Sequence, residues 1–438
     1  MAALASLVVA VVLGGYALVS ARAASAAVSG PMVFVAAGVA LGPLGLGLIG
    51  GERDAEAVQV LLEAALTLVL FADAALVGAG ELRRGGSLPS RLLALGLPLT
   101  VALGALAAWP LLPDLGVWQL ALLGTVLAPT DASLVRPALT DIRVPPLVRQ
   151  GINAESGLND GLAVPFFVVF LAASGGGPGG GSGGEPPGVG EVFALALPVS
   201  AACGIALGVA GGAGLAVSRR RGWAEPEWAR IFPATLALAA FTAADALHGS
   251  GFIAAWVAGL AFGNTARRAG AGNRPSAERT ADGLGFTDQL GALLTVLAYF
   301  AFGAVLLGPT LDGMTWATAA YALLSLTAVR MLPVALCLLR SGLRGATVAY
   351  VGWFGPRGLA SIVLGLLVAE ADVPGGGTVV AAVSLTVGLS VTAHGLSAAW
   401  LAGAYGRWYA DAAARDPELP EAALEPGSGP GVRTPFRG

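Results

Sequence analysis

Residues 152–167 read INAESGLNDGLAVPFF and place acidic and amide side chains inside an otherwise apolar stretch. Glu155 and Asn159 are four residues apart. Ser156 and Asp160 have the same spacing, so on a helix the two pairs form adjacent polar rows. A charge at the centre of a bilayer costs about 2.5–3.5 kcal/mol even on a lenient insertion scale. Because such charges usually pair with each other or line an ion path, this stretch is the first candidate for a functional site.

The composition of the whole chain places this stretch in a membrane protein. Of 438 residues, 56% are hydrophobic and 12% are charged, whereas an ordinary soluble domain has about 25% charged residues. The net charge of −3 provides no basic surface for nucleic acid. Cys203 and Cys337 lie in apolar runs and provide no disulfide framework or metal motif. These figures exclude a soluble enzyme, a disordered chain and a nucleic-acid binder.

About thirteen stretches have the length that a membrane helix needs, which is about 20 mostly apolar residues. Most arginines fall in the loops after odd-numbered stretches or in the C-terminal tail. Because cytoplasmic loops collect Arg, we expect the N-terminus outside and the C-terminus in the cytoplasm of a multi-pass protein of the cell membrane. We expect a membrane domain over residues 1–409 with a flexible, glycine-rich outer loop at 175–190, and a disordered tail over 410–438. The predicted spans are residues 3–21, 27–49, 57–79, 90–112, 116–139, 146–173, 192–217, 231–247, 250–264, 287–308, 315–339, 345–369 and 376–405.

One predicted span is interrupted just before the polar stretch. The segment LAPTDASLV (127–135) contains a proline, which removes a backbone donor and breaks a helix. Freed carbonyl groups at such a break can coordinate a cation. Thr130 adds a hydroxyl group and Asp131 a carboxylate. Hard monovalent cations prefer this all-oxygen chemistry, and the lack of Cys or His nearby argues against a transition metal.

A second interrupted span lies far along the chain, in YVGWFGPRGLASIVLG (350–365). Its Gly-Pro and Gly residues flank Arg357, which stays charged in proteins and needs a counter-ion. We choose Glu155 as this partner, which leaves Asp160, together with Asp131, as the titrating group. Interrupted helices in corresponding parts of two halves are the best sequence indication of a transporter site.

Four further ionisable residues lie within predicted spans. Glu63 and Asp245 are close enough to span ends to reach water. Arg330 either extends to the inner surface or pairs within the membrane, and the sequence leaves both open. Asp73 receives no role.

These motifs also carry a family resemblance, which covers about residues 5–405. The chain resembles bacterial sodium/proton antiporters of the monovalent cation:proton antiporter-1 family, which are relatives of animal sodium/hydrogen exchangers. The segments that carry the resemblance are APTD (128–131), ESGLNDG (155–161), GPRGLAS (355–361) and, more weakly, HGSGFIAAWVAGLAFGN (248–264) and SVTAHG (390–395).

The resemblance implies a function for individual residues. The Asn159–Asp160 pair would mark the ion site, with Asp160 binding a cation and a proton alternately. Thr130, Asp131 and Ser156 would help to coordinate the cation, Na⁺ or another monovalent ion. The pairing of Glu155 with Arg357 would be structural, as it is in the family.

The resemblance also implies an architecture and a mode of exchange. We expect an all-α polytopic protein with inverted repeats, two broken helices that cross in a core domain, and a homodimer. An Asn beside the Asp implies exchange of one cation for one proton, without a cofactor. The chain departs from the family where Ala132 stands in place of a frequent Pro, and in its glycine-rich loop.

Three other classes remain to be weighed. A cation channel could use the same oxygen atoms, and a symporter of another substrate could use the same fold. An intramembrane metalloprotease would need an H-E-x-x-H motif, which the sequence lacks. His248 and Ser250 could suggest a serine protease, but their HGSG segment fits a helix junction better, so we expect no enzyme.

Overall fold

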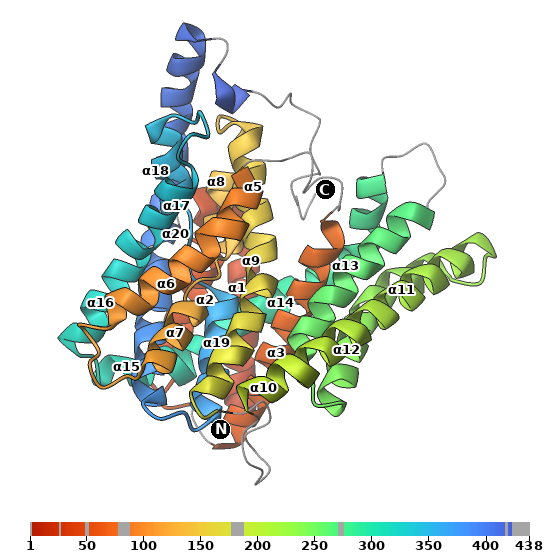
Figure 1. Cartoon of the computed structure of the whole chain (residues 1–438), viewed down its shortest axis with the longest axis horizontal. Coiled ribbons are helices and arrows are strands. Elements are labelled where there is room, and N and C mark those ends of the chain that lie inside the picture. Colours follow the sequence, from red (N-terminus) through yellow and green to blue (C-terminus); the bar gives the residue numbers. More distant parts are fainter. Residues whose placement is uncertain are drawn as a thin grey trace.

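The computed structural model describes residues 2–25, 28–48, 52–77, 88–176, 188–269, 276–416 and 419–422. In this part of the chain the regular elements are helices (Figure 1). Apolar segments of this length form helices because lipid provides no hydrogen-bond partners, so each backbone group must be paired within its own segment. The predicted all-α fold class is confirmed.

The helices follow the predicted spans in order along the chain. Among the described residues, seven helical segments are long and apolar enough to cross a membrane, and four shorter ones are also apolar. The structure therefore confirms a multi-pass membrane protein, while the number of thirteen spans stays a prediction. The elements are α1 (Ala2–Ser25), α2 (Gly30–Leu41), α3 (Glu52–Leu76), α5 (Leu88–Arg91), η1 (Leu92–Gly96), α6 (Leu97–Ala108), α7 (Val117–Val126), η2 (Ala132–Val135), α8 (Arg136–Thr140), α9 (Pro146–Ala173), α10 (Val189–Glu191), η3 (Val192–Ala196), α11 (Leu197–Arg220), α12 (Pro226–Ala246), α13 (Gly251–Ala269), α14 (Ser276–Ala301), η4 (Phe302–Leu307), α15 (Gly308–Asp312), α16 (Trp316–Leu326), α17 (Ala328–Cys337), α18 (Gly345–Trp353), α19 (Leu359–Glu370), α20 (Gly376–Arg415) and η5 (Pro420–Ala422).

The helices form two groups that lie side by side (Figure 1). The core group consists of α6 to α9 and α16 to α20, in which α6 packs on α7, α16 on α20 and α17 on α18. The flanking group consists of α3 and α11 to α14, in which α13 packs on both α3 and α11. Helix α9 contacts α7 in the core group and α3 and α13 in the flanking group. The polar stretch on α9 therefore lies where the two groups meet.

Glycines allow the closest helix contact in the flanking group. A Cβ atom on Gly259 of α13 would meet the backbone oxygen of Phe71 on α3, and one on Gly263 would meet that of Ala75. Small residues at a four-residue spacing let two membrane helices approach to backbone contact, where van der Waals packing holds them together. The closely packed pair of α3 and α13 lies beside α9 and contacts it.

The core group contains the same arrangement twice. One helix, one broken helix and one long helix follow each other as α6, α7 with α8, and α9, and again as α16 with α17, α18 with α19, and α20. In Figure 1, α7 leads upward to α8, whereas α18 leads downward to α19. The two broken helices thus run in opposite directions, as inverted repeats require.

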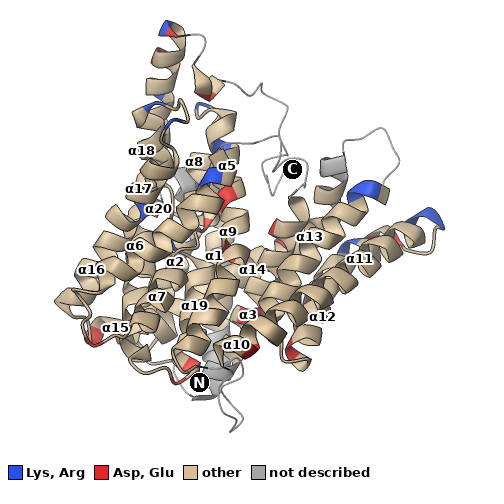
Figure 2. Cartoon of the chain, viewed as in Figure 1, with Lys and Arg blue, Asp and Glu red and all other residues tan. Residues whose placement is uncertain are grey.

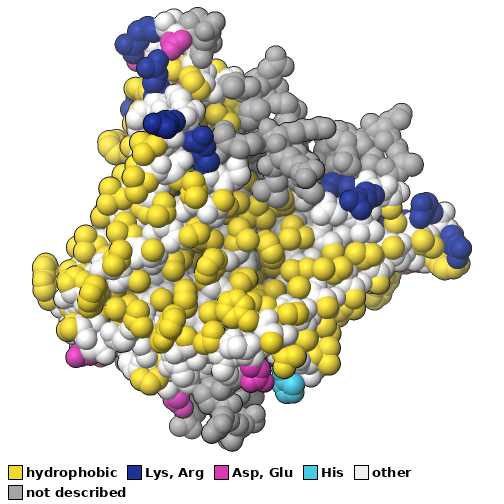
Figure 3. All heavy atoms as spheres, in the orientation of Figure 1, with side chains coloured by type: hydrophobic (Ala, Val, Ile, Leu, Met, Phe, Trp, Pro, Cys, Tyr) yellow, Lys and Arg dark blue, Asp and Glu magenta, His cyan; other side chains and the backbone are white. Residues whose placement is uncertain are grey.

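Charged and apolar side chains divide the surface into zones. In Figure 2 the described arginines gather at one end of the bundle, near α5, α18 and the end of α11. Figure 3 shows hydrophobic side chains over the middle of this face. An apolar belt with Arg at one rim is typical of a membrane protein whose Arg-rich rim faces the cytoplasm.

The C-terminal region differs from its prediction. The tail was expected to be disordered from residue 410, but α20 continues to Arg415. Leu419 and Glu421 are buried, so the segment Leu419–Ala422, here called the C-terminal clasp, packs on the protein. The prediction is wrong for these residues because Glu421 finds hydrogen-bond partners at the start of α18 and the segment packs on α9. The rest of the tail and residues 177–187 of the predicted outer loop lie outside the described residues.

The clasp binds the start of α18. Glu421 Oε1 accepts hydrogen bonds from the backbone N–H of Arg344 at 2.8 Å and from Thr347 Oγ1 at 2.6 Å. Asp416 forms a salt bridge of 2.8 Å with the side chain of Arg344. Acidic groups are favourable at this position because a helix N-terminus carries a partial positive charge.

Candidate functional site

The two predicted helix breaks meet in the middle of the core group. Helix α7 ends at Val126 and α18 ends at Trp353, and the chain is not helical over residues 127–131 and 354–358. The backbone N–H of Asp131 donates to the carbonyl oxygen of Pro356 at 2.8 Å. This hydrogen bond joins the two segments directly, so the predicted crossing of the broken helices is present.

Asp131 holds the start of the half-helix that follows the second break. Its Oδ2 accepts a hydrogen bond from the backbone N–H of Leu359, the first residue of α19, at 3.1 Å and one from Tyr299 Oη at 2.6 Å. Its Oδ1 accepts one from the N–H of Ser133 at 2.9 Å. A carboxylate in this position stabilises the positive end of the α19 dipole. A side chain on Gly358 would collide with this carboxylate and with Tyr299.

Arg357 places a positive charge at the first break, at the end of α7. Its side chain is fully buried, and Nη1 donates to the carbonyl oxygens of Ala128 at 2.9 Å and Pro129 at 3.2 Å. These carbonyl groups follow the end of α7, where the helix dipole is negative, so a guanidinium group is favourable there. The backbone N–H of Arg357 donates to Ser390 Oγ on α20 at 2.7 Å. The first break therefore supplies a negative charge, Asp131, to the positive end of α19. The second break supplies a positive charge, Arg357, to the negative end of α7.

The expected pairing of Glu155 with Arg357 is wrong as a direct contact. Glu155 instead accepts two hydrogen bonds from Arg330 on α17, at 2.5 Å to Oε1 and 2.8 Å to Oε2. The two side chains are 3% and 4% exposed, so Arg330 does not extend to the membrane surface. Arg357 uses only Nη1 for the carbonyl oxygens of the first break, and its Nε and Nη2 have no hydrogen-bond partner among the described residues.

Arg330 also reaches the second break. A Cβ atom on Gly355 would collide with the guanidinium group of Arg330. The Glu155–Arg330 pair therefore links α9 to the segment that carries Arg357, although by another arginine than the one predicted.

Ser156 and Asn159, one from each polar row of α9, contact the first break. Ser156 Oγ donates to the carbonyl oxygen of Thr130 at 2.5 Å and accepts from the N–H of Ala132 at 2.7 Å. Asn159 Nδ2 donates to Thr130 Oγ1 at 2.7 Å. Thr130, Ser156 and Asn159 are thus brought together in one buried network.

Asp160 lies next to this network with unused acceptor capacity. Its side chain is buried, and Asp160 Oδ1 and Asn159 Oδ1 have no hydrogen-bond partner among the described residues. A carboxylate has about four lone-pair sites, and the three donors to Asp131 fill only part of that capacity. Because buried acceptors are almost always hydrogen-bonded, these open oxygen atoms mark this part of α9 as the candidate functional site.

The flanking group covers this part of α9 with two side chains. Trp256 of α13 lies against Gly161, and Asp73 of α3 lies against Gly157. Asp131 and Asp73 are the charged groups that act on Asp160. The indole Nε1 of Trp256 is buried without a hydrogen-bond partner among the described residues. The open acceptors therefore lie at the boundary between the two groups of helices.

Sequence reasoning missed several residues of this arrangement. Tyr299 could not be singled out, because tyrosines are common in membrane spans. Ser390 and His394 lie in the SVTAHG segment, which the sequence marked without a role. His394 is buried, with Nδ1 at 3.0 Å from the oxygen of Ser390 and Nε2 at 3.0 Å from that of Trp353. His394 thus holds Ser390, whose hydroxyl accepts the hydrogen bond from the backbone N–H of Arg357.

Comparison with known proteins identifies the family. The family model described as sodium/hydrogen exchanger, transmembrane, matches residues 7–403. The chain belongs to the sodium/hydrogen exchanger family. This family consists of transporters rather than enzymes, in agreement with the sequence analysis.

Two solved structures of the sodium proton antiporter MjNhaP1 from Methanocaldococcus jannaschii share the fold of this exchanger-family chain. One, determined at pH 8, is 20% identical with a TM-score of 0.73, and the match covers 93% of this chain and 99% of that chain. The other, from an electron-microscopy map, is 21% identical with a TM-score of 0.68, and covers 92% and 97%. The likeness in fold therefore extends over nearly the whole chain.

Proposed function

We propose that this exchanger-family protein exchanges a monovalent cation, Na⁺ or in its place Li⁺ or K⁺, for H⁺ across the cell membrane. The observation that carries the proposal is the buried carboxylate of Asp160, which has an open acceptor oxygen beside the crossing. A cation and a proton are alternative positive partners for that oxygen. Family membership supports cation:proton antiport as the class of reaction.

Asp160 is the shared ligand, and its neighbours complete the proposed cation site. Thr130, Ser156 and Asp131 supply oxygen atoms from the first break and from the adjacent row of α9. Asn159 positions the hydroxyl of Thr130 through its amide group. Carboxylate, carbonyl and hydroxyl oxygens suit a hard cation, and the site requires no resident cofactor.

The charges of the core group support exchange of one cation for one proton. Within the core group the crossing holds three carboxylates, of Asp131, Glu155 and Asp160, and two guanidinium groups, of Arg330 and Arg357. Asp73 also lies near Asp160, but it belongs to the flanking group and is not part of this count. Bound Na⁺ and bound H⁺ each neutralise the one remaining negative charge. Both loaded forms then cross the membrane more readily than the empty form, since desolvating a net charge is unfavourable.

Alternating access follows from the position of Asp160 between the two groups of helices. Movement of the core group relative to α3 and α13 would expose Asp160 first to one side of the membrane and then to the other. The Arg-rich end supports a cytoplasmic C-terminus and an outer N-terminus (Figure 2). We keep a homodimer as part of the proposal, with the flanking group as the stationary part.

The decisive experiment measures H⁺ flux in proteoliposomes driven by Na⁺, K⁺ or Li⁺, with and without a membrane potential. Asp160→Asn should abolish exchange, and Asp372→Asn, the same change at an exposed position, should leave it intact. Exchange by Asp160→Asn at the wild-type rate would refute the site. Cation flux without proton coupling would indicate a channel, and exchange that depends on the potential would contradict one-for-one stoichiometry.

A further inference from the structure

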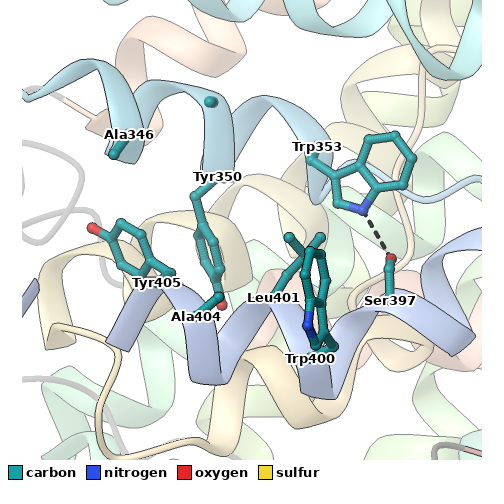
Figure 4. A pocket seen from close by; sticks show the side chains of 9 residues that line it. Ala346, Tyr350, Trp353, Ser397, Trp400, Leu401, Ala404 and Tyr405 are labelled. Carbon is teal, nitrogen blue, oxygen red and sulfur yellow. Dashed lines mark hydrogen bonds between the residues drawn. The ribbon is translucent and has the colours of Figure 1, made fainter. Parts of the chain in front are cut away.

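A groove lies on the surface of the core group, between α18 and α20 (Figure 4). Its volume is about 450 Å³, and its walls are almost wholly apolar. The main side chains that line it are Ala346, Tyr350 and Trp353 from α18 and Trp400, Ala404 and Tyr405 from α20. Figure 4 shows these rings along the two facing helices, with the Trp353 indole bonded to Ser397.

The groove runs from the Arg-rich rim toward the middle of the membrane. Ala346 and Tyr405 lie at the rim end, because α18 begins at Gly345 and α20 continues beyond Tyr405 to Arg415. Trp353 lies at the deep end, where α18 gives way to the crossing. Trp400 is 70% exposed on the side of the groove. At this depth the surrounding medium is hydrocarbon, so an apolar groove is suited to a lipid chain.

Positive charge lies at the rim end of the same groove. Arg407 is exposed and follows Ala404 by three residues, so it lies one turn along the same side of α20. A Cβ atom on Gly403 would lie 3.5 Å from a guanidinium nitrogen of Arg407 and 3.5 Å from one of Arg143. Arg143 is paired with Asp141, whereas no described carboxylate pairs with Arg407.

Acidic groups also face this region. Asp416 is paired with Arg344, and Glu421 accepts hydrogen bonds from the start of α18. Asp411 is exposed on α20, but it follows the last groove residue, Tyr405, by six positions, whereas Arg407 follows it by two. Arg407 is therefore the charged residue of α20 next to the groove. Basic side chains at this level attract the anionic head groups of the cytoplasmic leaflet.

We propose that the groove between α18 and α20 binds one anionic phospholipid of the inner leaflet. One acyl chain lies between Trp353 and Trp400, and the phosphate lies at Arg407. This proposal rests on the membrane location of the two helices and does not depend on the proposed ion exchange.

The deep end of the groove reaches the network of the crossing. Trp353 contacts the ring of His394, and its carbonyl oxygen lies 3.0 Å from His394 Nε2. His394 in turn contacts Ser390, which accepts the backbone N–H of Arg357. A lipid in the groove thus lies against α18, the half-helix that precedes the second break and Arg357.

The test is a titration of delipidated protein in detergent with phosphatidylglycerol, followed by native mass spectrometry. Ala404→Trp fills the groove, and Ala399→Trp makes the same change at an exposed position of α20 that does not line it. An acyl chain that loses the burial of about two methylene groups to the new side chain binds about tenfold more weakly. We therefore expect Ala404→Trp to lose one tightly bound lipid that the wild type and Ala399→Trp retain, with all three proteins equally well folded by thermal unfolding.

A second arm tests the head group. Arg407→Gln should weaken phosphatidylglycerol binding about fivefold, since one basic residue near anionic lipid contributes about 1 kcal/mol. It should leave the binding of zwitterionic phosphatidylcholine unchanged, and Arg220→Gln, at the end of α11, should change neither. Equal lipid binding by the wild type and Ala404→Trp would overturn the proposal. So would a change in oligomeric mass of Ala404→Trp without a change in bound lipid, because the groove would then hold a second copy of the chain.

Discussion

The buried pair of Glu155 and Arg330 provides the sharpest test of how the crossing is held together. Glu155→Ala removes two charge-assisted hydrogen bonds, of 2.5 and 2.8 Å, from a guanidinium group whose side chain is 4% exposed. The arginine cannot reach water, so its charge is left unpaired in a low-dielectric site. Breaking a buried pair in this way costs about 3–5 kcal/mol. We expect Glu155→Ala to lower the free energy of unfolding by that amount.

The assay is equilibrium unfolding in mixed micelles, followed by tryptophan fluorescence, for both single variants and the double variant. Since the two side chains contact each other, Glu155→Ala and Arg330→Ala should be non-additive by about 0.5–3 kcal/mol. Asp312→Ala, at an exposed position of α15, serves as the control and should leave stability unchanged. Strict additivity, or a coupling of Glu155 to Arg357 that exceeds its coupling to Arg330, would refute the arrangement.

Three further changes test other contacts. Gly358→Ala should abolish exchange and lower the melting temperature, because its Cβ would displace the carboxylate that holds α19; wild-type exchange by this variant would contradict the close contact. Ser390→Ala should lower the free energy of unfolding by about 1–3 kcal/mol, since it leaves the buried N–H of Arg357 without an acceptor, and a smaller loss measured for Ser390→Thr would show that the hydroxyl is what matters. The side-chain hydrogen bond from Arg143 lowers the pKa of Asp141, so its stabilising effect is present above the usual carboxyl pKa and is lost as the pH falls through the lowered value. Melting temperatures of the wild type and Asp141→Asn should therefore converge at low pH, and a constant difference would contradict the assignment.

Local chemistry explains how much of the crossing could be predicted. Pro129 and the Gly-Pro-Arg-Gly segment disfavour a continuous helix through their own backbone chemistry. Charged side chains beside such a break in an apolar span usually pair with each other or line an ion path. The four-residue spacing of Ser156 and Asp160 fixed one face of α9 before its neighbours were known. These features depend on adjacent residues alone, so one sequence was sufficient to find them.

The choice between partners depends on tertiary structure and was out of reach. Arg330 and Arg357 are both buried arginines in apolar spans, and nothing local distinguishes which of them meets Glu155. The one available signal was Gly355, whose missing side chain makes room for the guanidinium group of Arg330. Tyr299 joins the site from α14, about 170 residues from its partner in the chain, at a distance that local patterns do not span.

The C-terminal clasp has a practical consequence for work on this protein. Glu421 is hydrogen-bonded to the start of α18, so the residues that follow it extend from a point attached to one broken helix. A purification tag or fluorescent protein fused after residue 422 would be attached close to that helix. A truncation before residue 419 would remove the hydrogen bonds of Glu421 to its first turn. Fusions at the C-terminus should therefore be compared with the untagged protein before any rate is assigned to the native chain.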